Sequence, residues 1–267
     1  MPAEASTIVI RGHVIGGEET PAASGGTFES VDPATTRAIA RLAKGDAQDV
    51  DRAVRAARAA QPSWAAMDPM DRTRLFVRFA ELIEGHADEL ARTESLDVGK
   101  PIREAAKRDL PVVLNTWLYH SGWPTKILGT TNPADPGVFT YTMREPLGVV
   151  GAITPWNFPA VIASWKIAPA LACGNTIVHK PSGEAPLSSL RLAELALEAG
   201  FPPGVWNVVT GPGSTGAALA GHDDVDKLSF TGSTEVGREI QRAAAGNLKR
   251  LTLELGGKSA NVVLEDA

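Results

Sequence analysis

The sequence predicts an α/β fold, in which a doubly wound parallel sheet follows a helical N-terminal part and a protruding β-hairpin arm. Up to about residue 125, apolar residues recur mainly at helical spacing. Between about 126 and 146 the chain is rich in Thr, Pro and Gly. From about 147 to 267, short apolar runs alternate with helical patterns, which is typical of βαβ units whose parallel sheet is covered on both faces.

Helix boundaries in the first part follow from local start and stop signals. Asp46 is a plausible N-cap of the first helix, and Asp68-Pro69 supplies a cap and an N1 proline for the second. A third helix is expected over Ala87–Val98, ending at Gly99. A fourth helix follows, which Pro111 should kink or divide because it lacks an N–H group.

The arm and the sheet are predicted from the rest of the chain. Residues 129–143 resemble a hairpin-like arm that leaves the body, and 138–143 alternate like a strand. The expected strands are 148–154, 176–179, 206–210, 227–231, 251–255 and 261–264. The helices between them are expected at 160–172, 187–199, 214–220 and 233–245. Ligands of such sheets bind at the carboxyl ends of the strands.

Composition excludes several classes of protein. The chain has 267 residues, a formal net charge of -5 and a pI of about 5.6, so we expect neither nucleic acid nor acidic lipid as a partner. No run approaches the ~20 apolar residues of a membrane helix, and Met1 to Ile10 does not resemble a secretory signal. Cys173 is the single cysteine, so no intrachain disulfide is possible, which fits a reducing cytoplasm.

Two glycine-containing turns follow predicted strands. Residues 211–216 match G-x-G-x-x-G, but the expected strand-end acid is missing, so a simple strand-to-helix turn is as good an interpretation as a phosphate site. Residues 232–237 also open a helix, which Ser233 can cap, and free N–H groups there suit a phosphate. Arg238 and Glu239 stand where a P-loop needs Lys and Ser/Thr, which excludes nucleotide triphosphate hydrolysis.

Three further residues could carry chemistry, each with a structural alternative. Glu254 lies in an apolar strand end, where the charged carboxylate is disfavoured and the raised pKa would suit a general base. Spacing alone favours the alternative, a structural ion pair with a lysine such as Lys258. Asn157 lies in a turn between two prolines, where its amide could face an oxyanion or simply shape the turn. Cys173 ends a helix and is expected to be a small buried apolar residue.

Taken together and in this order, the motifs resemble those of the NAD(P)-dependent aldehyde dehydrogenase family. The most specific are Thr154-Pro-Trp-Asn-Phe-Pro159, 230–237 and Leu253-Glu-Leu-Gly-Gly-Lys258, and the resemblance runs from about Val31 to the last residue. Residues 141–148 look like the broad class that acts on small, aromatic or amino-aldehydes. The resemblance implies a Rossmann-like cofactor domain over about 147–267.

The resemblance also implies roles for individual residues. Asn157 would donate to the oxyanion of a tetrahedral intermediate, and Glu254 would activate the water that hydrolyses a thioester. NAD would be the cofactor. The residues that it implies for cofactor binding are Thr154, Trp156, Lys180, Gly213, Gly232, Ser233, Val236, Gly237 and Leu255. No metal site is expected, because the five histidines show no paired spacing.

The chain departs from the family pattern at two points. The family's catalytic cysteine is expected a few dozen residues after the Leu-Glu-Leu-Gly-Gly motif, beyond Ala267, so we expect this chain alone to be inactive. Gly183 stands where many NAD-using members have a glutamate that repels the 2′-phosphate of NADP. NADP is therefore a second candidate cofactor. The adjacent Glu184 could partly replace the missing carboxylate.

Two functional hypotheses follow from the sequence. In the first, the chain is the cofactor-binding part of an oxidoreductase that converts an aldehyde to a carboxylic acid and forms a homo-oligomer when full length. In the second, it is a non-enzymatic, truncated module that binds NAD or docks onto other subunits.

Overall fold

A seven-stranded sheet forms the centre of the protein in the computed structural model, which describes residues 9–267. In spatial order its strands are β12 (Arg250–Leu255), β11 (Lys227–Gly232), β8 (Val149–Ile153), β9 (Thr176–Lys180), β10 (Trp206–Val208), β2 (His13–Ile15) and β3 (Glu18–Thr20). The expectation that Met1 to Ile10 is no secretory signal falls mostly outside the described residues.

The parallel part of the sheet is doubly wound, which confirms the predicted fold class. The first five strands in that order run parallel. Strand β2 then pairs antiparallel with β10, and β3 pairs antiparallel with β2. The connecting helices are α6 (Pro159–Ala172), α7 (Leu187–Glu198), α8 (Gly213–Gly221) and α9 (Thr234–Ala243). From β8 the chain moves through β9 to β10, then returns to β11 on the other side of β8. The direction of winding therefore reverses between β8 and β11.

Both faces of the central strands are covered by helices. Every residue of β8 and β9 is buried, as expected for parallel strands between two helical layers. One apolar core joins the sheet to α6, α7 and helices of the N-terminal part that include α2, α3 and α5. The other core joins it to α1, α8 and α9. Within residues 9–267, no helix is long and apolar enough to cross a membrane.

The helices of the N-terminal part begin and end close to where their capping residues predict. They are α1 (Ala47–Ala66), α2 (Pro69–Gly85), α3 (Ala87–Val98), α4 (Ile102–Glu104) and α5 (Leu110–Ser121). The Asp46 and Asp68 carboxylates accept backbone N–H groups at the starts of α1 and α2. Gly99 ends α3 with a left-handed φ of 77°, which glycine adopts without steric cost.

A π-helical turn divides the fourth predicted helix. The segment η1 (Ala105–Asp109) lies between α4 and α5, and the Leu110 N–H bonds to the Ala105 carbonyl five residues earlier. Pro111 follows directly and contributes no N–H group. The wider turn before the proline is therefore where the helix changes its hydrogen-bond pattern, as the sequence predicted.

Residues 9–43 contain strands that the helical interpretation of this part did not include. Besides β2 and β3, a separate sheet has the order β1 (Val9–Arg11), β5 (Ala38–Ala43) and β4 (Thr27–Val31). These strands have three to six residues, too few for a clear alternation of apolar and polar side chains. Their pairing depends on partners elsewhere in the chain rather than on local pattern.

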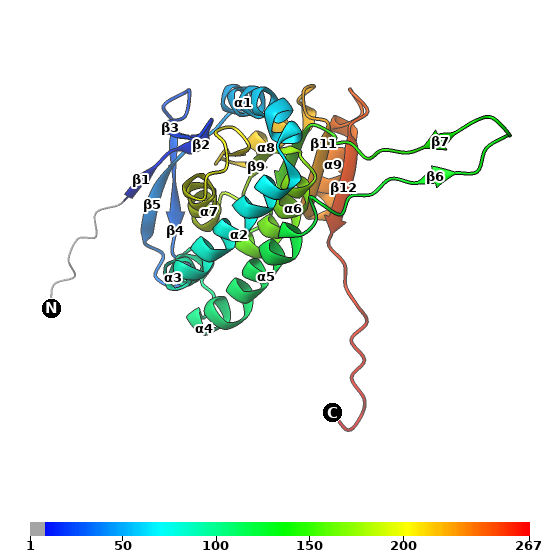
Figure 1. The fold of residues 1–267 in the computed structure, drawn as a ribbon. Helices are drawn as coiled ribbons and strands as arrows, with labels where there is room; N and C mark the ends of the chain where they lie inside the picture. The colour runs from blue at the N-terminus through cyan, green and yellow to red at the C-terminus, as the bar shows by residue number, and fades with distance from the viewer. Residues whose placement is uncertain (1–8) are drawn as a thin grey trace.

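The hairpin arm is present as predicted. Strands β6 (Thr131–Asn132) and β7 (Thr140–Tyr141) pair antiparallel, and Figure 1 shows the hairpin projecting well away from the body. Phe139 and Tyr141 are exposed on the arm, with their ring centroids 5.9 Å apart. The arm therefore carries apolar surface that has no cover within the described chain.

The prediction of a strand at residues 261–264 is wrong. This segment has no regular structure, and its side chains are exposed, Val262 at 76%. A strand needs a neighbour to accept and donate its backbone hydrogen bonds. Residues 256–267 leave the sheet edge after β12 and pair with no strand among residues 9–267 (Figure 1).

Aromatic rings from α2, α5 and the region of β10 form a cluster in the core. Phe79 is fully buried, lies 4.5 Å from Trp117 in an edge-to-face arrangement and also contacts Phe201 and Trp206. Edge-to-face pairs add to the stabilisation from burial alone. This cluster joins the N-terminal helices to the face of the parallel sheet.

We predict that Phe79→Ala lowers the free energy of unfolding by about 3–5 kcal/mol, because it removes buried area and leaves a cavity. Urea denaturation monitored by circular dichroism measures the change. Val77→Ala on the same helix is the control, since Val77 is 37% exposed. Equal losses for the two variants would contradict the central place of the aromatic cluster.

Candidate functional site

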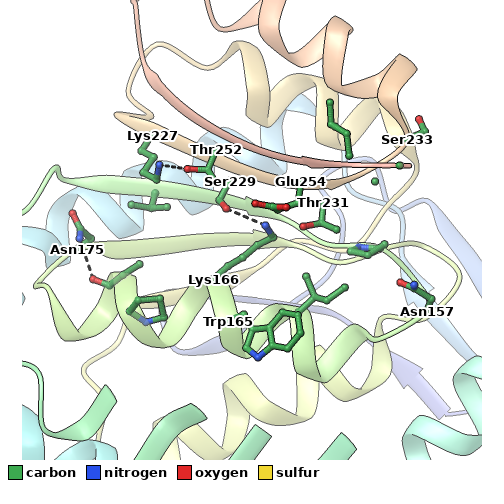
Figure 2. Close-up of a pocket in the computed structure, with 18 of the residues that line it drawn as sticks. Asn157, Trp165, Lys166, Asn175, Lys227, Ser229, Thr231, Ser233, Thr252 and Glu254 are labelled. Atoms are coloured by element: carbon green, nitrogen blue, oxygen red, sulfur yellow. Dashed lines mark hydrogen bonds between the residues drawn. The ribbon is translucent and has the colours of Figure 1, made fainter. Parts of the chain in front are cut away.

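Two cavities flank the loop that follows β8. The switch-point cavity, of about 740 Å³, lies at the carboxyl ends of β8, β9 and β11 and at the N-termini of α8 and α9. The edge cavity, of about 980 Å³, lies between α6 and the β11–β12 side of the sheet (Figure 2). Trp156, Gly232 and Ser233 line both cavities. The two spaces therefore adjoin at the point where the winding of the sheet reverses.

The structure brings nearly all of the predicted site residues to these cavities. Those on the switch-point cavity are Thr154, Trp156, Lys180, Gly213, Gly232, Ser233 and Val236. Those on the edge cavity include Asn157, Glu254 and Leu255. Gly237 lines neither cavity, but a Cβ atom there would lie 2.5 Å from Leu255 Cδ2, so glycine allows α9 to pack against that side chain.

Lys180 places an ammonium group in the switch-point cavity. It ends β9, is only 6% exposed, and makes no side-chain hydrogen bond to any residue in the range 9–267. Burial lowers the pKa of Lys180 to about 8, opposed by the nearby Glu184 carboxylate. A buried donor without a protein acceptor fits a polar ligand in this cavity.

Two helix N-termini face the same cavity. The Ser233 hydroxyl accepts the Val236 N–H group at 3.2 Å, so it caps α9 as predicted. Helix α8 has no side-chain cap, and a Cβ atom on Gly213 would meet nothing within 4 Å. The first N–H groups of a helix have no intrahelical acceptor and favour anions. The geometry of the two helix N-termini is therefore compatible with phosphate binding at both turns, 211–216 and 232–237.

Glycine is sterically required at one point of the G-x-G-x-x-G turn. Gly211 has a φ of 155°, and a Cβ atom there would collide with the Thr215 hydroxyl. The same hydroxyl donates to the Gly45 carbonyl at 2.5 Å, which ties the turn to the start of α1. Close packing therefore explains this glycine whether or not a phosphate binds nearby.

Glu254 and Asn157 face the edge cavity from opposite elements. Glu254 projects from β12, and Asn157 belongs to the loop before α6 (Figure 2). The expectation that Glu254 is buried is wrong. The residue is exposed, because β12 is the edge strand of the sheet. The alternative pair with Lys258 is also absent, since that ammonium donates to the Gly257 carbonyl at 3.2 Å.

Lys166 places an ammonium group in the same cavity as Glu254. Its ammonium donates to the Ser229 hydroxyl at 3.0 Å on the floor of the edge cavity (Figure 2). Burial lowers the pKa of Lys166 to about 8, and the Glu254 carboxylate opposes this shift. The edge cavity therefore combines a carboxylate, an ammonium and an amide.

Cys173 differs from its sequence-based expectation. It follows α6 as predicted, but it is exposed and lines the edge cavity rather than the core. Partial burial raises the pKa of its thiol, opposed by the Arg72 charge. A thiol with a raised pKa at the negative end of a helix is a poor nucleophile.

The comparisons with known proteins agree with this geometry. The model of the aldehyde dehydrogenase family matches residues 20–267. The chain belongs to this family. It is 51% identical over 258 residues to the mitochondrial aldehyde dehydrogenase of Homo sapiens, a match that covers 95% of the chain and 50% of the human protein.

Other aldehyde dehydrogenases show the same partial coverage. Aldehyde dehydrogenase family 2 member B4 of Arabidopsis thaliana is 50% identical over 258 residues, 95% of this chain and 48% of its own. The NAD+ complex structure of the aldehyde dehydrogenase from Bacillus cereus superposes with a TM-score of 0.92 at 48% identity, covering 96% and 52% of the two chains. This chain thus spans about half the length of the relatives it matches.

The side chains that support loop 154–159 are not among the residues predicted from the sequence. Lys100, after α3, donates to the Asn157 carbonyl at 3.2 Å and forms an ion pair with Asp109. Glu94 on α3 accepts the Ala160 N–H group at 3.4 Å. No local motif marks these residues, because their partners lie far away in the sequence. The burial of these charged residues marks them, and only the structure reveals that burial.

Within residues 9–267, no group of three or more His, Cys, Asp or Glu side chains could hold a metal ion. His179, the histidine nearest the cofactor residues, is fully buried, and its Nε2 atom lies 2.9 Å from the Thr154 hydroxyl. Burial lowers the pKa of His179 to about 3, so the ring is neutral at pH 7. It therefore acts on Thr154 as a neutral hydrogen-bond partner.

We predict that Glu94 makes the protein less stable as pH rises. Burial raises the pKa of Glu94 from 4.5 to about 7, opposed by the nearby Ser188 hydroxyl and the Lys100 charge. Between these values the folded protein holds more protons than the unfolded chain, so stability falls through this window and levels off above it. Glu94→Gln removes this contribution, which is about 3 kcal/mol for a shift of this size.

Urea unfolding of both proteins at pH 5 and pH 8 measures the effect. The variant should gain stability over the wild type on going to pH 8, whereas Glu84→Gln, at an exposed position of α2, should not. An unchanged pH dependence in Glu94→Gln would show that the buried carboxyl does not titrate in this range.

Proposed function

We propose that this chain forms the NAD(P)-binding part of an enzyme that oxidises an aldehyde to a carboxylic acid. The observation that carries the proposal is the switch-point cavity, which combines a nearly buried, unpartnered Lys180 ammonium with two helix N-termini. A dinucleotide needs donors for ribose hydroxyls and for a pyrophosphate, and these groups supply both. The likeness to the NAD+ complex of the Bacillus cereus enzyme supports the same cofactor.

Individual residues then take distinct roles toward the cofactor. Lys180 would donate to hydroxyls of the adenosine ribose, and the start of α9 at Gly232 and Ser233 would face the pyrophosphate. Trp156 and Leu255 would line the passage between the two cavities. Thr154, Gly213, Val236 and Gly237 would shape the cofactor cleft. Bound NAD(P)+ would supply the hydride acceptor for the oxidation.

The edge cavity would hold the reacting aldehyde. The Asn157 amide would donate a hydrogen bond to the developing oxyanion, and Glu254 would accept a proton from the attacking water. Aldehyde oxidation in this family also needs a thiolate nucleophile. Cys173 does not meet that need, given its raised pKa and its position at the end of α6.

The state of Cys173 also supports the second candidate, a module that binds the cofactor without turning over an aldehyde. The projecting arm with exposed Phe139 and Tyr141 suits docking onto other subunits. A homo-oligomer whose subunits contact one another through such arms, and a cytoplasmic location, are part of the proposal for the whole protein. Both candidates share the same cofactor cavity, so binding and turnover must be tested separately.

We predict that the purified chain binds NAD+ and that Lys180→Met weakens this binding by about 10- to 100-fold, because charge-assisted hydrogen bonds are lost. Isothermal titration calorimetry measures the affinity, and Lys107→Met, at an exposed position, is the control. Unchanged affinity in Lys180→Met would exclude the switch-point cavity as the NAD+ site.

We also predict that the purified chain does not form NADH from NAD+ and an aldehyde, as followed by absorbance. Robust turnover would contradict the assignment of Cys173 as inert.

The missing carboxylate at position 183 should broaden cofactor choice. Gly183 lines the switch-point cavity beside the exposed Glu184, and a Cβ atom there would lie 3.3 Å from the Gly211 carbonyl oxygen, tight but tolerable. We predict that the wild type accepts NADP+, and that Gly183→Glu weakens NADP+ binding about tenfold more than NAD+ binding through charge repulsion.

The same titrations with Gly183→Ala separate the steric effect from the charge. If Gly183→Ala and Gly183→Glu shift the NADP+/NAD+ ratio equally, repulsion of a 2′-phosphate is not the cause. If the wild type already excludes NADP+, Glu184 supplies the discrimination instead.

A further inference from the structure

The loop that carries Asn157 is exposed in its middle. Residues 154–159 connect β8 to α6, and both Trp156 and Asn157 are exposed. No side chain within the loop caps α6, whose N-cap residue is Phe158. The ends of the loop are held at Thr154, whose N–H group donates to the Lys180 carbonyl, and at the buried Pro159, so the exposed residues between them have the least support. An exposed amide on such a loop needs an outside contact to keep one direction.

Lys100 supplies a contact to the Asn157 backbone. Its ammonium donates to the Asn157 carbonyl at 3.2 Å and lies 4.2 Å from the centroid of the Phe158 ring. The side chain is only 12% exposed and forms an ion pair with Asp109, which is 3% exposed. The ammonium thus touches two consecutive loop residues while a buried carboxylate holds it in place.

Glu94 adds a second attachment one residue beyond the loop. One of its carboxyl oxygens accepts the Ala160 N–H group at 3.4 Å, at the start of α6 where N–H groups lack intrahelical acceptors. The residue is fully buried, and its other oxygen has no hydrogen-bond partner among the described residues. Contacts therefore reach the segment at 157, 158 and 160 from one side.

The three supporting residues lie within a short stretch of the N-terminal part, from α3 to η1. Glu94 lies on α3, Lys100 follows the left-handed Gly99, and Asp109 ends the π-helical turn η1. π-helical turns are rare and occur often at functional sites. Here the turn ends at the carboxylate that holds the lysine. The irregular backbone thus lies where the loop is anchored.

We propose that Lys100, held by Asp109 and assisted by Glu94, is a positioning residue that keeps Asn157 directed toward the edge cavity. A purely structural ion pair would only connect the two parts of the chain that carry it. Lys100 in addition donates a hydrogen bond to the backbone carbonyl of Asn157, the residue that faces the cavity. The role of Asn157 toward an oxyanion rests on the proposed function, whereas the anchoring of the loop does not.

Backbone order at Asn157, measured by ¹⁵N relaxation on the full chain, tests the proposal. In the wild type the order parameter should be near the rigid value of about 0.85, despite the exposure of the residue. A value below about 0.6 in the wild type would overturn the proposal without any variant.

The decisive variant is Lys100→Met/Asp109→Asn, which removes the donor without leaving a buried charge unpaired. We expect the order parameter of Asn157 to fall below about 0.6, and amide exchange of Ala160 to rise about tenfold or more. Val113 on α5 should be unaffected. Lys100→Arg should restore order, because a guanidinium can reach the same acceptors, and Lys107→Met is the exposed control.

An ordered Asn157 in the double variant would overturn the proposal and leave the ion pair with a purely structural role. A global loss of protection that includes Val113 would do the same, since the effect would not be local. NAD+ titration of these proteins is a separate readout. Loss of loop order with intact NAD+ binding supports the role of Lys100 as a positioning residue. Failure of the wild type to bind NAD+ would contradict only the proposed function.

Discussion

The reversal of winding between β8 and β11 is the constraint on which the rest of the structure depends. Helices that follow β8 and β9 cover one face, and those that follow β10 and β11 cover the other, so the loops after β8 and β11 diverge. The divergence opens a space that no side chain of the core fills. Two helix N-termini and the end of β9 then meet there, and each brings uncompensated donors.

The chain balances that polar opening with a dense apolar base. Strands β8 and β9 are buried throughout, and the aromatic cluster around Phe79 and Trp117 ties the N-terminal helices to the sheet. A polar cavity can stay open only if the elements that frame it cannot move together to close it. The rigid base therefore determines the geometry above it as much as the residues lining the cavity do.

Much of the fold could be predicted because its signals are local. Asp46, Asp68 and Gly99 mark helix ends through hydrogen bonds or backbone angles that involve only neighbouring residues. The motifs at 154–159 and 230–237 likewise identified the cavity residues before their positions were known. Local chemistry is sufficient wherever the partner of a group lies within a few residues of it.

The errors share the opposite cause. The burial of Glu254 and the strand at 261–264 depended on neighbours at the sheet edge, which the pattern of apolar residues cannot reveal. The contact of Lys100 with Asn157 spans 57 residues, and nothing near either residue indicates the other. The exposure of Cys173 has the same origin, since the end of α6 looks apolar in sequence but borders the edge cavity.

The most direct test of the central claim is to map backbone amide chemical-shift changes in the full chain as NAD+ is added. The account predicts the largest changes at Lys180, Gly213 and Ser233, which meet at the switch point from three separate elements. Changes confined to the N-terminal sheet or to the arm, or no changes at millimolar NAD+, would contradict it.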